Sequence, residues 1–139
     1  MPTFVLSEQS SVVAGVVLLT IVTIEFGGTF LLRIARGRVP MTAFQKSFAR
    51  AGHAHAGVLV TLALVCLVLA DATSLTGVLG WIARLGVPVA AVLISGGFFA
   101  SSAGRGEVHQ PNRWVALVWG GAASLAAGVV TLGLGLIVA

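Results

Sequence analysis

Four long apolar runs constrain the fold of this chain more than any other feature of its sequence. They cover residues 12–34, 50–70, 83–101 and 113–137. Each is about as long as a helix that crosses the hydrocarbon core of a bilayer, which takes roughly 20 residues. In lipid a helix satisfies its backbone polar groups within one segment, and the alternating pattern of barrel strands is missing here. We therefore expect an all-α, integral membrane four-helix bundle, with residues 1–139 forming a single transmembrane domain.

The composition supports a lipid environment and excludes several classes of protein. Of the residues, 58% are hydrophobic and only 9% are charged, whereas a soluble domain carries roughly 25% charged residues. A soluble enzyme core and a disordered chain are both excluded on this ground. The net charge of +4 comes from scattered basic residues and not from a phosphate-tracking stripe, so no nucleic-acid partner is expected. The lone Cys66 is expected to be a buried apolar residue.

The basic residues predict how the chain is oriented. They gather in the first and third connections, as Arg36, Arg38, Lys46, Arg50, Arg105 and Arg113, while the second connection has only Arg84. The positive-inside rule then places the first and third connections in the cytoplasm and both termini outside. The first run follows an acidic segment, which favours a retained span over a cleaved signal. We expect a multi-pass protein of a bacterial inner (plasma) membrane.

Several single residues carry further structural expectations. Arg84 is expected either to reach the lipid headgroups or to pair with Asp71. Pro88 is expected to kink or to start the third span. Trp114 suits the membrane interface, whereas Trp119 is expected to be packed.

Glu25 is the first candidate functional residue, because it lies well inside the first apolar run. A carboxylate in hydrocarbon is costly, so it pairs with a cation or takes up a proton. A proton or cation site is one interpretation. A structural hydrogen bond to the second or third helix is the other.

His53 and His55 form the second candidate feature, at the start of the second run. They are two residues apart, hence about 200° apart around a helix, and one straight helix cannot turn both rings to one ion. We expect each ring to face a different neighbour, one of them Glu25. The alternatives are structural bonding, a proton or metal site of Glu25, His53 and His55 with His109 as a further ligand, and haem ligation. The cofactor, a transition metal ion or haem, stays open.

Glycines are expected to mediate helix packing, because they let membrane helices approach closely. The candidates are Gly27, Gly28, Gly57, Gly96, Gly97, Gly120 and Gly121. A glycine face also suits self-association, so we expect a homo-oligomer or a place in a larger membrane complex.

The segment Glu25-Phe26-Gly27-Gly28-Thr29-Phe30-Leu31-Leu32-Arg33 resembles the first helix of small multidrug resistance transporters. That family consists of four-helix chains that dimerise, with a membrane glutamate that exchanges protons for cationic substrates. The resemblance implies that Glu25 is the proton and substrate carboxylate and that Gly28 and Thr29 pack around it. It covers about nine residues. The lack of tyrosine, the His-Ala-His stretch and the long basic first connection depart from it. As a whole, the chain looks like small four-span bacterial membrane proteins of uncharacterised function.

Three function classes follow from these features, and none of them is enzymatic. The leading hypothesis is a proton- or metal-ion-linked carrier or channel subunit that uses the Glu25 and His53/His55 site. The alternatives are a non-catalytic accessory subunit of a larger, respiratory membrane complex and a haem- or quinone-associated membrane protein. No nucleophile–base pair, phosphate-binding loop or catalytic carboxylate pair is readable in the sequence.

Overall fold

The protein is an all-helical bundle. The computed structural model describes residues 5–104 and 107–139, and no strand occurs among them. The four long helices are α1 (Glu8–Ala35), α2 (Ala43–Ala70), α3 (Gly77–Ser101) and α4 (Ala116–Ile137), with a short 3-10 turn, η1 (Arg113–Val115), before α4. Each span is long and apolar enough to cross a membrane. The predicted four-helix transmembrane bundle is therefore confirmed.

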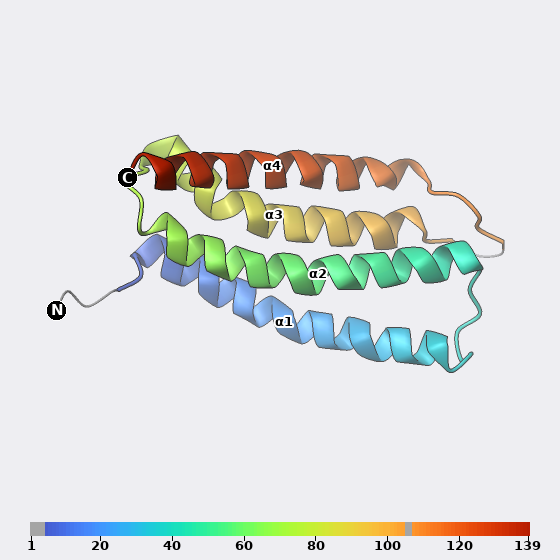
Figure 1. Cartoon of the computed structure of the whole chain (residues 1–139). Helices are drawn as coiled ribbons and strands as arrows, with labels where there is room; N and C mark the ends of the chain where they lie inside the picture. Colours follow the sequence, from blue (N-terminus) through green and yellow to red (C-terminus); the bar gives the residue numbers. More distant parts are fainter. Residues whose placement is uncertain (1–4, 105–106) are drawn as a thin grey trace.

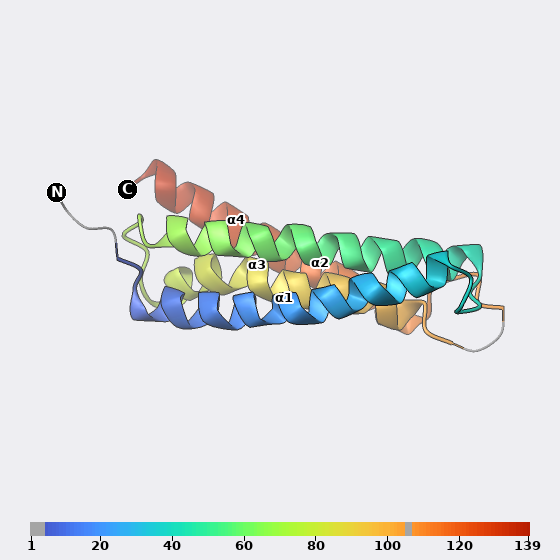
Figure 2. The same ribbon diagram turned by 90° about the horizontal axis from the view of Figure 1, so that it is seen from below.

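The helices follow one another in space in chain order, as a row that runs from α1 to α4 (Figure 1). The view from below shows α1 crossing the outer side of α2 and α3 (Figure 2). Helices α2 and α3 form the middle of the row. Helix α1 packs mainly on α2 and only slightly on α3. It is therefore an edge helix, and few of its residues are buried in the bundle.

All three spans that precede α4 begin earlier than the apolar runs predicted. The Ser7 hydroxyl caps α1 by accepting a hydrogen bond from the Ser10 N–H. Thr42 and Gln45 form a capping box that starts α2 at Ala43, seven residues before the apolar run that begins at residue 50. Both caps precede the apolar segments, so hydropathy alone misses these polar first turns. Helix α3 begins at Gly77, so Pro88 lies inside the helix and does not start it.

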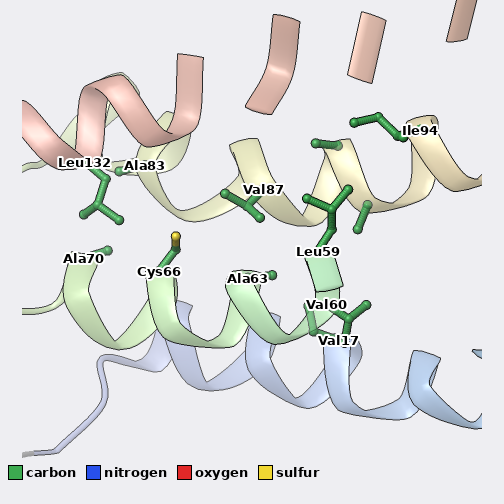
Figure 3. Close-up of a cluster of buried hydrophobic side chains, with 12 residues drawn as sticks. Val17, Leu59, Val60, Ala63, Cys66, Ala70, Ala83, Val87, Ile94 and Leu132 are labelled. Atoms are coloured by element: carbon green, nitrogen blue, oxygen red, sulfur yellow. The ribbon is translucent and has the colours of Figure 1, made fainter. Parts of the chain in front are cut away.

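Small apolar side chains from α2 and α3 form the centre of the core (Figure 3). Ala63 and Ala70 of α2 and Ala83 and Val87 of α3 are completely buried. Cys66 lies among them as a buried free thiol, as expected. Such small side chains bring the two helices close together, which is how helices associate in lipid.

Helices α3 and α4 approach each other through glycines. A Cβ atom built on Gly128 would lie 2.9 Å from the Cα of Gly86, so the two backbones touch at this point. Further along, Gly97 lies against Val118 and Gly121 against Ile94. Gly97 and Gly121 were among the packing glycines expected from the sequence, whereas the crossing of Gly86 and Gly128 was not singled out.

Three of the other predicted packing glycines do not lie in a contact between helices. Gly57, Gly96 and Gly120 have open space where a side chain would be, so they face no neighbouring helix among residues 5–104 and 107–139. Trp119 also points away from the bundle and is 74% exposed. The expectation that Trp119 is packed is wrong, because α4 is the outer helix of the row and directs this residue outward.

A buried polar cluster joins three helices at the end of the bundle where α1 starts. Arg84 of α3 donates to the Asp71 carboxylate at 2.7 Å, and both side chains are less than a tenth exposed. The Ser7 N–H and hydroxyl and the Ser10 hydroxyl donate to the same carboxylate at 2.8–2.9 Å. The expected pair of Arg84 and Asp71 is thus confirmed, and α1 is bound into it through its first turn.

The hydrogen bonds around Asp71 decide its ionisation. Burial opposes the charged form, but the donors on Ser7, Arg84 and Ser10 outweigh burial and hold the pKa of Asp71 below its usual value. The ionised carboxylate is therefore the form that binds the three helices together. Because the folded pKa is the lower one, its contribution to stability is complete above the unfolded pKa and is lost as the pH falls through the folded pKa.

Replacing Asp71 tests this linkage. We expect Asp71→Asn to lower the unfolding free energy at pH 7 by about 3 kcal/mol or more, because Arg84 loses its buried counter-charge. The difference from wild type should shrink as the pH falls below about 4, near the usual pKa of aspartate. Unfolding by sodium dodecyl sulfate, followed by circular dichroism at several pH values, measures both. The exposed Glu8→Gln is the matched control, and a gap between wild type and Asp71→Asn that is independent of pH would contradict the assignment.

The contact between Gly86 and Gly128 predicts that alanine substitutions at Gly120 and Gly128 change the unfolding free energy in opposite directions. Alanine is the better helix former by up to about 1 kcal/mol, so Gly120→Ala, with nothing nearby, should keep or raise stability. Gly128→Ala should instead destabilise the protein by about 1–3 kcal/mol, because its Cβ meets the Gly86 backbone, which cannot rotate away. The same detergent titration compares the two variants, and equal effects would show that α3 and α4 are not in backbone contact.

Candidate functional site

Glu25 lies on the outer face of α1. Its side chain is exposed, and its neighbours Val22 and Phe26 are 58% and 72% exposed. It has no hydrogen bond or ion pair with any residue in the described part of the chain. Arg33 follows eight residues later on the same helix, roughly 12 Å along the axis. The carboxylate therefore lies deep in the span, on a surface where hydrocarbon or another protein chain is its neighbour.

The His53 ring faces α1, but it lies against Gly27 and Gly28 and not against Glu25. A Cβ atom built on Gly27 would lie 3.1 Å from the His53 Nδ1, and one on Gly28 would lie 3.6 Å from its Cε1. These two glycines leave the space that the imidazole occupies. Gly27 and Gly28 are two and three residues after Glu25, hence about 200° and 300° around the helix, so the side between them is about 110° away from Glu25. Helix α1 therefore turns Glu25 away from the side on which Gly27 meets the ring, and the expected contact between His53 and Glu25 does not form within the chain.

His55 faces α3 instead. Its ring lies 5.1 Å from the Phe98 ring, and its Nδ1 is 2.8 Å from the Ala51 carbonyl oxygen. Because a carbonyl only accepts hydrogen bonds, the Nδ1 carries a proton, and the Nε2 of the neutral ring is an acceptor. Phe48 and Phe44 continue the aromatic row beyond Phe98. The two histidine rings thus contact different helices, as their spacing predicted.

His109 stays apart from this region. It lies in the connection before η1, where its Nε2 is 3.4 Å from the Glu107 carboxylate and both side chains are well exposed. Within residues 5–104 and 107–139, no three His, Cys, Asp or Glu side chains come close enough to hold a metal ion. The expected metal site of Glu25, His53, His55 and His109 is therefore not assembled in a single chain, because these groups point to different sides.

A groove runs beside His53 between α1 and α2. Its volume is about 700 Å³, and its walls are almost entirely apolar. The lining residues are Ile24, His53, Ala54, Gly57, Val58, Thr61, Leu62 and Val65. Thr61 donates its hydroxyl hydrogen to the Gly57 carbonyl. Among the residues that line the groove, His53 is the one with a titratable side chain.

Two buried polar residues were missed in the sequence. The Gln45 amide donates to the carbonyls of Ser102 and Gly104, and so fixes the end of α3 to the start of α2. The Thr42-x-x-Gln45 spacing of a capping box was the signal that could have found it. Ser95 is also buried, but a serine in an apolar run gives no such signal.

Comparisons with protein-family models, with curated proteins and with solved structures found no match for this chain. Functional conclusions therefore depend on the residues themselves.

The position of Glu25 predicts its reaction with dicyclohexylcarbodiimide, a lipid-soluble reagent that modifies carboxyl groups in hydrocarbon. In membranes, we expect one label per chain at Glu25, because the other carboxylates lie at or beyond the helix ends. Peptide mass spectrometry locates the label, and Glu25→Gln should abolish it while Glu8→Gln leaves it unchanged. Labelling that persists in Glu25→Gln would place the reactive carboxyl elsewhere.

Proposed function

We propose that the protein is a subunit of a small proton-linked membrane carrier or channel, in which Glu25 takes up and releases the proton. The observation that carries the proposal is the exposure of this carboxylate, deep in a span, on the outer face of the edge helix α1. A carboxylate in hydrocarbon is rare and costly unless it has a partner or a function. Its likeness to the membrane glutamate of small multidrug resistance transporters supports the same role.

The proposed working form contains more than one chain. Helix α1 has few contacts within the bundle, and Glu25 has none of its own among the described residues. A second copy of the chain that covers this face of α1 would exclude lipid from the carboxylate. It would also supply the groups that a single chain does not bring to Glu25. A transition metal could then bind only if histidines of two chains met there.

The proposed orientation keeps both termini outside and the basic connections in the cytoplasm. The basic residues near the junctions of α1 with α2 and of α3 with α4 support it: Arg33, Arg36, Arg38, Lys46, Arg50 and Arg113. At the opposite end of the bundle, the single basic residue Arg84 is paired with Asp71. The positive charge that the cytoplasmic side requires is thus concentrated at one end. His53, which lies against Gly27 and Gly28, would then be on the cytoplasmic side of Glu25 along α1.

Proton flux tests the function. Wild-type protein in liposomes with an internal pH-sensitive dye should take up protons when a potassium diffusion potential is imposed with valinomycin. Glu25→Gln should reduce this flux to that of protein-free liposomes, because a neutral amide cannot titrate, while Glu8→Gln should keep it. Equal flux through wild type and Glu25→Gln, including no flux through either, would contradict the proposal.

A second candidate function is that of an accessory subunit in a larger membrane assembly. The observation that favours it is the 74% exposed Trp119, which presents an aromatic surface on the other edge of the row. Purification in a mild detergent separates the candidates. Retention of other membrane proteins favours the accessory subunit, and a stable homo-oligomer without them favours the carrier.

A further inference from the structure

The groove beside His53 is open along the outer face of α2. The α2 residues that line it lie between His53 and Val65, and among them Val58 and Val65 are 67% and 48% exposed. At a rise of about 1.5 Å per residue, this stretch of α2 is roughly 18 Å long. One leaflet of a bilayer contributes roughly 15 Å of hydrocarbon. The groove therefore has the length and the apolar walls that suit the acyl chain of a lipid.

Two basic residues of α2 lie in line with this groove. Arg50 precedes Ala54 and Gly57, which line the groove, by four and seven residues, and these spacings put side chains on one face of a helix. Lys46 is four residues before Arg50 and shares that face. Arg50 is exposed and Lys46 is half-buried. They lie roughly 5 and 10 Å beyond His53 along the axis, so one end of the apolar groove carries positive charge.

This positive charge has no carboxylate partner in the part of the chain that the structure describes. Lys46 and Arg50 belong to neither of the two ion pairs found among residues 5–104 and 107–139. Arg36 and Arg38 lie in the connection that leads to the same end of α2, and both are exposed (Figure 1). An anionic group beside Arg50 would supply the missing counter-charge. The arginine guanidinium matches the geometry of a phosphate in particular.

We propose that the groove binds an anionic phospholipid, whose acyl chain lies along α2 between His53 and Val65 and whose phosphate pairs with Arg50 and Lys46. A free anion would leave the apolar walls uncovered. A zwitterionic lipid would bring its own cation close to the basic residues. The His53 ring, which lies between the basic end and the apolar walls, would face the ester groups of the bound lipid. The proposal does not depend on the role of Glu25.

Native mass spectrometry of the protein in dodecyl maltoside micelles tests the proposal. The probe is palmitoyl-oleoyl phosphatidylglycerol, and phosphatidylcholine with the same two chains is the comparison. We expect the first phosphatidylglycerol to bind wild type more tightly than phosphatidylcholine does. Arg50→Gln should weaken phosphatidylglycerol binding about fivefold, because one basic residue beside the headgroup is lost. The matched control is Arg113→Gln, which removes an equal charge beside Trp114 and should leave the affinity unchanged.

A second pair of variants tests the acyl chain. Gly57 lines the groove and has open space where a side chain would be, so Gly57→Leu fills the groove without a clash in the bundle. It should weaken phosphatidylglycerol binding about tenfold, because roughly two methylene groups of the lipid lose their burial. Gly120→Leu, at an equally open glycine of α4, should leave the affinity unchanged. If Gly57→Leu does not fold, Val58→Trp at an exposed position of the groove replaces it.

Four results would overturn the proposal. Equal affinity of wild type for the two lipids would remove the role of charge. Equal losses in Arg50→Gln and Arg113→Gln would show an attraction to the total charge of this end and not a site. Unchanged affinity in Gly57→Leu would show that no chain lies in the groove. Displacement of phosphatidylglycerol by an equal concentration of inorganic phosphate would show that the site takes the phosphate group alone.

Discussion

The fold depends on the ion pair of Asp71 and Arg84, because it is the point at which three helices meet through buried charges. Arg84 comes from α3, Asp71 ends α2, and the Ser7 and Ser10 hydroxyls bring in the first turn of α1. In lipid, apolar side chains provide little preference for one helix neighbour over another. A charge with a single matching partner does provide it. The pair thereby fixes which ends of α1, α2 and α3 lie together, and the glycine contacts then set how closely α4 approaches α3.

Much of this fold could be predicted from the sequence, because hydropathy depends on composition within one segment. The four spans and the burial of Cys66 follow from it directly, and the pairing of Asp71 with Arg84 was one of two expected outcomes. Hydropathy did not predict the capped first turns of α1 and α2, because these turns are polar. The Gly86–Gly128 crossing could not be predicted for a different reason. Which glycine of a glycine-rich helix meets a neighbour depends on the rotation of both helices, and a single segment does not contain that information.

The candidate site was predictable in its residues but not in its arrangement. Helical geometry correctly separated His53 and His55, since a spacing of two residues fixes their relative direction. It did not reveal that α1 would turn Gly27 and Gly28, rather than Glu25, toward His53. Ser95 stayed unnoticed because a serine in an apolar run has an ordinary way to satisfy its hydroxyl. Only the three-dimensional structure shows that Ser95 does not use it.

The way α1 is attached has a mechanical consequence. All side-chain hydrogen bonds that join α1 to the other described helices lie in Ser7 and Ser10, at one end of a 28-residue rod. Beyond that end, α1 is held against α2 by apolar contacts and by the packing of the His53 ring on Gly27 and Gly28. A rotation of α1 about this end would displace the helix more at greater distance from Asp71. Glu25 and the α1 wall of the His53 groove lie far from that end, so a small rotation at the serines would produce a large change in what the carboxylate meets.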